Sequence, residues 1–104
     1  MSTFLQGYIS AKNKNQANKI LNSLLNQKLV AGGLLLNGPS SFWWRGKIEH
    51  INYYNISIFT KEQYKRLIIT DVLRVSDEKV PMVWFTEISC NEELAHWIEK
   101  NLNI

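Results

Sequence analysis

One cysteine and two histidines are the side chains of this sequence that could bind a soft or borderline metal ion: Cys90, His50 and His96. Cys90 and His96 lie six residues apart across an expected helix start. Two ligands on one helical face are instead spaced four residues apart. His50 has no second ligand type at useful spacing beside it. The sequence therefore predicts no metal site built from a Cys/His cluster.

Two neighbouring carboxylates, those of Asp77 and Glu78, could bind a harder cation. Lys79 follows them, and a polar run of this kind is more typical of a solvated loop. No serine or cysteine has a recognisable base partner, and no glycine-rich loop resembles a phosphate cradle. Gly32 and Gly33 fall inside an expected strand, where close backbone approach explains them better than a ligand does. We predict that the protein is not an enzyme.

The stretch SSFWWRGKIEH, residues 40–50, places Trp43 and Trp44 beside Arg45 and Lys47. On a strand, successive side chains point to opposite faces, so one tryptophan could fill a core while the other would need a different partner. Arg45 and Lys47 could hold an anion in a cleft between subunits, or could simply keep a hairpin soluble. The sequence leaves both interpretations open.

Length and composition favour one globular domain over residues 1–104, with 45% hydrophobic and 20% charged residues. The net charge of +3 comes from scattered basic residues, so we expect no nucleic-acid partner. Cys90 is the only cysteine, which leaves no internal disulfide and favours a reducing compartment. The first residues lack the pattern of a signal peptide, and the apolar runs are too short for a membrane span. We predict a cytoplasmic protein without a membrane partner.

Hydrophobic periodicity predicts strands at residues 4–9, 29–36 and 80–88 and across the strand-rich region 42–59. Helices are expected at residues 14–27, after a capping box at 60–63, and after Asn91. The Asn-Gly-Pro run at 37–39 predicts a turn. Asn52 and Asn55 predict a bulge or bend within the third strand.

This order, β-α-β-β-α-β with a trailing helix, predicts an α+β fold of the ferredoxin-like kind, with two helices on one face of a four-stranded antiparallel sheet. The fold hosts many functions, so residues must decide among them. Acylphosphatases carry an arginine after the first strand, where this chain has SAKNKN. RNA-recognition modules carry an aromatic RGFGFV-like run, which RGKIEHIN does not match.

Four fragments carry a stronger resemblance: LLNQKLVAGGLLL; Phe42, Trp44, Gly46, Lys47 and Ile48; Val80-Pro81; and Leu94, Trp97 and Ile98. In this order they are similar to the motifs of the CutA family, small proteins linked to divalent-cation tolerance. The resemblance covers nearly the whole chain. It implies a homotrimer in which a long hairpin reaches a neighbouring subunit and a tryptophan packs across the interface, where aromatic residues are enriched.

The same resemblance implies positions for copper ligands, and this chain departs from the family at each of them. Gly32 stands where family members carry a cysteine, and Ser76 stands where they carry a histidine. Ile58 stands at the position of a family lysine. The resemblance therefore implies copper as a possible divalent metal partner, but no certain cofactor and no metal ligands.

Two functions follow as hypotheses. The first is a non-enzymatic, CutA-like homotrimer associated with divalent metal ion tolerance, copper in particular. The alternative is a trimeric sensor or adaptor resembling the nitrogen-regulatory PII proteins, which binds an anionic ligand between subunits beside Trp43, Trp44, Arg45 and Lys47.

Overall fold

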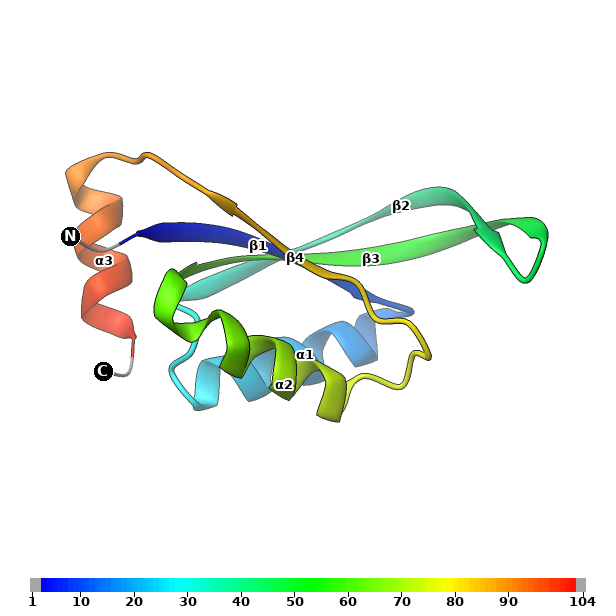
Figure 1. Cartoon of the computed structure of the whole chain (residues 1–104), viewed down its shortest axis with the longest axis horizontal. Helices are drawn as coiled ribbons and strands as arrows, with labels where there is room; N and C mark the ends of the chain where they lie inside the picture. Colours follow the sequence, from blue (N-terminus) through cyan, green and yellow to red (C-terminus); the bar gives the residue numbers. More distant parts are fainter. Residues whose placement is uncertain (1–2, 103–104) are drawn as a thin grey trace.

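A computed structural model describes residues 3–102 of the chain. Figure 1 shows its elements in chain order: β1 (Phe4–Ala11), α1 (Lys14–Asn26), β2 (Gly32–Trp44), β3 (Lys47–Lys61), a short 3₁₀ turn η1 (Glu62–Tyr64), α2 (Lys65–Val75), β4 (Val83–Glu87) and α3 (Glu92–Asn101). The strands form one antiparallel sheet in the order β2-β3-β1-β4, with α1 and α2 on the same face. The predicted α+β, ferredoxin-like fold is confirmed. No helix among residues 3–102 is long and apolar enough to span a membrane.

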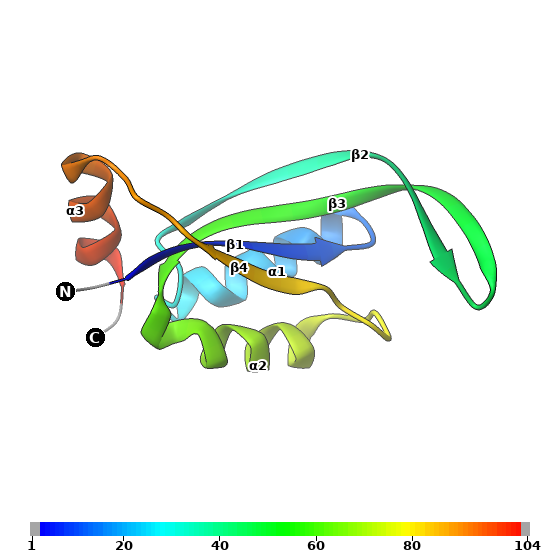
Figure 2. The ribbon, with the colours of Figure 1, turned by 45° about the horizontal axis from the view of Figure 1, so that its top comes forward.

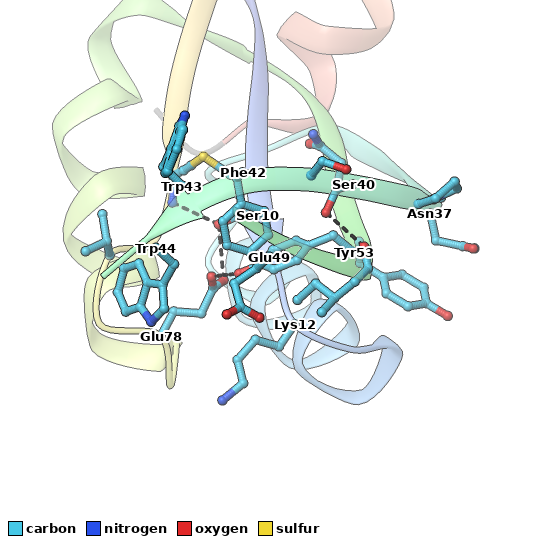
Figure 3. Close-up of a pocket in the computed structure, with 18 of the residues that line it drawn as sticks. Ser10, Lys12, Asn37, Ser40, Phe42, Trp43, Trp44, Glu49, Tyr53 and Glu78 are labelled. Atoms are coloured by element: carbon cyan, nitrogen blue, oxygen red, sulfur yellow. Dashed lines mark hydrogen bonds between the residues drawn. The ribbon is translucent and has the colours of Figure 1, made fainter. Parts of the chain in front are cut away.

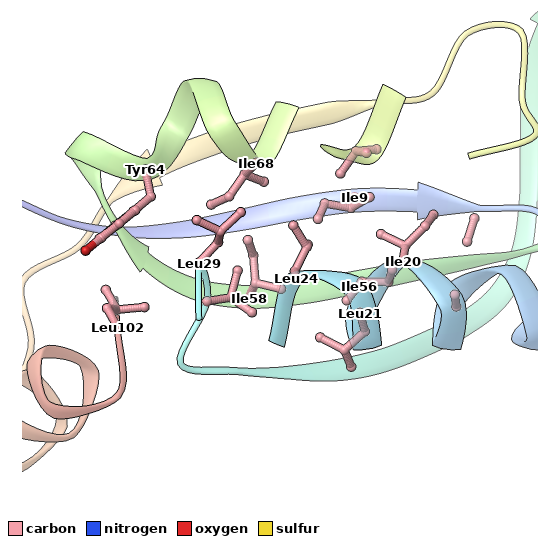
Figure 4. Packing of buried hydrophobic residues seen from close by; sticks show 14 of the residues in the cluster. Ile9, Ile20, Leu21, Leu24, Leu29, Ile56, Ile58, Tyr64, Ile68 and Leu102 are labelled. Atoms are coloured by element: carbon pink, nitrogen blue, oxygen red, sulfur yellow. The ribbon is translucent and has the colours of Figure 1, made fainter. Parts of the chain in front are cut away.

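The core lies between this sheet and the two helices (Figure 4). Ile20 and Leu24 of α1 and Ile68 of α2 are fully buried against Ile56 and Ile58 of β3. The amphipathic spacing of these residues explains both helices, since each turns one apolar stripe towards the sheet. As predicted, α1 begins after Asn13, whose side chain accepts a hydrogen bond of 2.8 Å from the backbone N–H of Gln16.

Strands β2 and β3 form a hairpin that extends well beyond the rest of the sheet (Figures 1 and 2). Their pairing is continuous from Gly32–Phe59 to Trp44–Lys47. Arg45 and Gly46 form the connecting turn with φ values of 51° and 78°, which is the two-residue I′ geometry of tight hairpins. The turn therefore lies at the tip of the hairpin.

The predicted turn at residues 37–39 is wrong, because β2 runs straight through it and pairs Pro39 with Asn52. An edge strand tolerates a proline that has no N–H to donate, and β2 is an edge strand. Of the bulge or bend predicted near Asn52 and Asn55, the bulge is wrong, since both residues keep one-to-one partners, whereas a curved strand agrees with the bend. The hairpin curves smoothly (Figure 2).

The predicted helix start at 60–63 is displaced towards the C-terminus. Strand β3 continues to Lys61, and Thr60 is fully buried within it. The Thr60 hydroxyl donates a hydrogen bond of 2.7 Å to the carbonyl of Leu29 and does not cap a helix. The long-range hydrogen bond to Leu29 thus prevails over the local cap that the sequence predicts for Thr60.

The sheet face opposite α1 and α2 carries exposed apolar side chains; we call it the open face. One row runs across all four strands through Leu34, Ser57, Tyr8 and Trp84. Leu34 is 60% exposed, and Trp84 is 51% exposed although its ring stacks on Tyr8 at a centroid distance of 4.4 Å. Leu36 extends the same face and is also exposed. The helix layer thus covers one side of the sheet and leaves an apolar surface on the other.

A buried carboxylate, that of Asp71, ties α2 to α1. Its Oδ2 accepts a hydrogen bond of 2.7 Å from the Ser23 hydroxyl, and its Oδ1 accepts one of 2.7 Å from Arg74. Burial alone would raise the pKa of Asp71. The hydrogen bonds from Ser23, Arg74 and Gln27, together with the charge of Arg74, outweigh burial and hold this pKa below its usual value.

We expect Asp71→Asn to lower the free energy of unfolding at neutral pH by about 2 kcal/mol, because it removes a charged hydrogen-bond acceptor. The folded pKa lies below the unfolded one, so ionised Asp71 stabilises the fold above the unfolded pKa, and this contribution is lost as the pH falls through the folded pKa. Urea unfolding of both proteins at about pH 7 and about pH 3 measures this effect. The difference between their free energies of unfolding should be smaller at the lower pH. An equal gap at both pH values would contradict this role.

Candidate functional site

A groove of about 1100 Å³ lies beneath the projecting hairpin (Figure 3). One wall is the hairpin itself, including Phe42, Trp44 and Tyr53. The facing wall is the end of β1 with the segment that joins α2 to β4. Ligand pockets usually combine an apolar lining with a few placed polar groups, and this groove has that composition.

The charged centre of the groove is the carboxyl group of Glu78. Its Oε1 accepts a hydrogen bond of 3.1 Å from the hydroxyl of Ser10, and its Oε2 accepts one from the hydroxyl of Tyr53 (Figure 3). The backbone N–H of Met82 donates to Ser10 Oγ at 2.8 Å. Burial raises the pKa of Glu78, although the bond from Ser10 and the charge of Lys12 act in the opposite direction. Glu78 therefore joins the first strand, the hairpin and the loop before β4.

Aromatic side chains line the hairpin side of the groove. Phe42 and Tyr53 meet edge to face at a centroid distance of 5.9 Å. The guanidinium of Arg45 lies 5.6 Å from the centre of the Trp44 ring, within the range of a cation–π contact. Trp44 is 37% exposed and Trp43 is 72% exposed, so neither fills the core of its own chain.

The residues that we predicted for this region are brought together at the hairpin tip. Trp43, Trp44 and Arg45 line the groove. Lys47 pairs with Trp44 in the strand ladder but does not line the groove. Sequence reasoning missed the bonds of Glu78 with Ser10 and Tyr53, because these residues are distant along the chain and no local pattern connects them.

Comparison with known proteins relates this arrangement to a family. The model of the CutA1 divalent ion tolerance protein family matches residues 6–101. The chain belongs to this family.

Individual relatives agree with that assignment. A divalent-cation tolerance protein CutA from Archaeoglobus fulgidus is 26% identical over 96 residues, covering 91% of this chain and 94% of the relative. The solved structure of the periplasmic divalent cation tolerance protein CutA from that organism has a TM-score of 0.89 and covers 99% of this chain and 100% of its own. CutA1 from Oryza sativa, at 21% identity, has a TM-score of 0.92 over 97% of this chain and 94% of its own.

Gly32, the first position that the resemblance implies for a metal ligand, packs closely against the ring of Trp97. A Cβ atom on Gly32 would lie 2.6 Å from Cη2 of the Trp97 ring, so a cysteine at this position requires the ring to move. Trp97 packs edge to face on Phe59 at a centroid distance of 6.5 Å. Gly32 is thus accounted for by the packing of α3 on the sheet.

Ser76, the second position that the resemblance implies for a metal ligand, has a local structural role. It follows α2, and its hydroxyl accepts a hydrogen bond of 3.2 Å from the backbone N–H of Glu78. Strand β2, which begins at Gly32, starts at the end of the sheet that carries α3, whereas α2, which Ser76 follows, ends towards the other end (Figure 1). Within one chain, these two positions do not face each other.

The remaining metal-binding side chains of this CutA1 chain are dispersed. His50 Nδ1 and Ser41 Oγ are 2.8 Å apart across the hairpin. Cys90 lies in the segment before α3, and His96 lies within α3. Among residues 3–102, no three side chains of His, Cys, Asp or Glu gather as they would around a metal ion.

A buried lysine near α3 also escaped sequence reasoning. Lys61, at the end of β3, is almost fully buried, and its Nζ lies 3.0 Å from Glu99 Oε1. Ile58, at the position implied for a family lysine, is instead fully buried in the core. The ion pair of Lys61 with Glu99 joins residues 38 positions apart, and neither strand nor helix periodicity indicates such a partner.

Proposed function

We propose that the protein is a non-enzymatic, trimeric member of the CutA1 family that contributes to tolerance of divalent metal ions, copper among them. The observation that carries this proposal is the family match over residues 6–101. Copper comes from the family resemblance. The cytoplasm stays our predicted location, while the word periplasmic describes the archaeal relative.

The bare apolar surface supports the assembly. Leu34 and Trp84 on the open face, and Trp43 on the hairpin, are each more than half exposed in the single chain. Several large apolar side chains left this exposed on one chain are typical of an interaction surface. A closed homotrimer would cover this surface in every subunit alike, and three-fold symmetry is what the resemblance to CutA proteins implies.

The function itself can be tested by growth. We expect cells that lack this protein to tolerate less copper than cells that carry it, and re-expression should restore tolerance. Growth curves at rising copper concentration provide the measurement, with zinc and cobalt in parallel to identify the range of ions. Equal growth with and without the protein in all three metals would contradict the proposal.

Direct copper binding should be weak. A tight Cu(II) site needs several nitrogen or sulfur ligands in defined geometry, and the candidates His50 and Cys90 lie on separate elements. Isothermal titration of tag-free protein should give a Kd no tighter than about 10 µM, or about 7 kcal/mol. Submicromolar binding at one or three ions per trimer that His50→Ala or Cys90→Ala abolishes would show instead that subunits build a metal site together.

The PII-like alternative stays a prediction with less support from the groove. An anion would have to approach Arg45, whose guanidinium is already placed over Trp44, and would meet the carboxylates of Glu49 and Glu78 in the same groove. Titration with adenosine triphosphate is the direct test of that alternative.

A further inference from the structure

The excess positive charge of the chain lies in the helix layer. Residues 14–28 and 65–75, which contain α1 and α2, hold six of the 12 Lys and Arg residues but only one of the 9 Asp and Glu residues, Asp71. These two segments therefore carry a net charge of +5, whereas the rest of the chain carries −2. A charge asymmetry of this size favours association with a partner of the opposite charge.

The carboxylates near these helices are already bound to groups of their own chain. Asp71 is buried, and its oxygens accept hydrogen bonds from Ser23 and Arg74. Glu62, just before α2, lies 3.1 Å from the ammonium of Lys65. The exposed cations of the helix layer that form no ion pair among residues 3–102 are Lys14, Lys19, Lys28 and Arg66. These four charges are available to a partner.

Exposed apolar side chains lie beside the cations of α2. Arg66, Thr70 and Leu73 are spaced by four and three residues, so they form one line along the helix surface, and all three are exposed. Leu67 is next to Arg66 in the chain and is 53% exposed. A shallow hollow of about 390 Å³ lies along α2, lined in part by Arg66, Ile69 and Thr70. An apolar side chain of a partner that entered this hollow would lie next to a positive charge.

The helix layer also stays accessible in the proposed trimer. That assembly uses the open face and the hairpin, whereas α1 and α2 cover the opposite face of the sheet. No other element of the described chain lies outside α1 and α2 on this side (Figures 1 and 2). The outer surface of the helix layer is therefore separate from the surface that subunits would share.

The chemistry of this surface favours an acidic protein segment over a nucleic acid or a membrane. Single-stranded nucleic acids usually stack on aromatic rings, and neither α1 nor α2 contains an aromatic residue. A helix that lies in a membrane surface turns its apolar stripe to the lipid, whereas α1 and α2 bury theirs against the sheet. A protein segment with carboxylates and a few apolar side chains matches both the cations and the exposed leucines.

We propose that the outer surface of α1 and α2 binds an acidic, leucine-containing segment of a partner protein. Arg66 and Lys19 are its main charged contacts, and Leu73 is its main apolar contact. Lys19 lies one turn before Ser23, whose hydroxyl reaches Asp71 of α2, so Lys19 is on the side of α1 that borders α2. This inference goes beyond metal tolerance and involves no metal ion.

The probe for this surface is a synthetic helical peptide in which glutamates surround leucines at every third or fourth position. Its match carries lysine in place of each glutamate. Fluorescence anisotropy of the labelled peptides should show saturable binding of the acidic peptide, with a Kd below about 100 µM, and none of the match. NMR should show amide shifts in residues 14–28 and 65–75 and none in the hairpin.

Substitutions on the two helices should weaken binding of the acidic peptide. Arg66→Gln and Lys19→Gln should each raise the Kd about fivefold. Leu73→Glu should raise it at least about twentyfold, because it removes an apolar contact and adds a negative charge. Lys100→Gln makes the same charge change at an exposed position of α3 and is the control, which should leave the Kd unchanged. All four side chains are exposed, so the core should stay intact.

Several results would overturn the proposal. These are equal binding of the two peptides, no binding of the acidic peptide up to about 1 mM, or an equal loss of binding in Lys100→Gln. Amide shifts in the hairpin would do the same, as would tighter binding of an RNA oligonucleotide or of phosphatidylserine vesicles. Thermal melting and light scattering of each variant show whether fold and assembly are kept. If Leu73→Glu fails to fold, Arg66→Gln and Lys19→Gln still decide the outcome. A failure here leaves the copper growth assay untouched.

Discussion

Replacing Leu34 by glutamate should reduce the particle from about three times the 12.1 kDa chain mass to a single chain. Leu34 is 60% exposed in the single chain, so a carboxylate there remains hydrated and the fold should be retained. In the proposed trimer the same carboxylate would be removed from water without a partner, once in every subunit, at a cost of several kcal/mol each. Light scattering at micromolar concentration, with circular dichroism for the fold, gives the result.

A matched control lies on the other side of the molecule. Leu73 of α2 is 58% exposed and belongs to the helix layer, away from the open face. Leu73→Glu makes the same chemical change and should leave the mass of the trimer unaltered. A Leu34→Glu protein that keeps the mass of the parent would remove the open face from the interface. A parent protein that is itself monomeric would remove the trimer altogether.

Replacing Ile58 by alanine should lower the free energy of unfolding by about 4 kcal/mol, near the upper end for core truncations. Ile58 is fully buried, and its neighbours on adjacent strands include Gly7 and Gly33. Its side-chain atoms lie 3.0 Å from the Cβ position of Gly7 and 3.4 Å from that of Gly33, so they fill the space that two missing side chains leave. Glycines cannot relax into the cavity, and the cost of a cavity rises with the volume that stays empty.

Urea unfolding measures this cost, with Ile58→Val as the comparison. Valine removes one methyl group and should cost about 1 kcal/mol. If alanine costs less than about 2 kcal/mol, the neighbouring strands close the gap and the glycines do not hold it open. The denaturant slope should stay the same in all three proteins, because the surface exposed on unfolding barely changes.

Periodicity was sufficient for the fold because the helices and the inner strands each bury a single apolar face. The spacing of Ile20, Leu24 and Ile68 follows from that burial, and so does the ferredoxin-like order. The hairpin escaped the same reasoning because its outer part, residues 37–53, pairs with no strand beyond β2 and β3. Gly38 and Pro39 therefore predict a turn. In the structure their pairing with β3 keeps them extended.

The sequence indicated only some of the residues of the candidate site. Trp43, Trp44 and Arg45 stood out by type and proximity, and they meet at one groove. Glu78 read as part of a solvated loop, because its partners Ser10 and Tyr53 lie 68 and 25 positions away. Contacts across such distances follow from how strands are ordered in the sheet, which no local pattern of residues contains.

The long outer edge of β2 has a consequence for the way the protein is made. It is an edge strand of 13 residues, and beside it lies the exposed apolar face of the sheet. Before it assembles, a newly synthesised chain exposes the unpaired backbone N–H and C=O groups of this edge, which can pair with any extended segment. Productive association then competes with indiscriminate strand pairing for as long as the edge stays uncovered. The speed with which subunits associate therefore decides how much of the newly made protein is lost to aggregates.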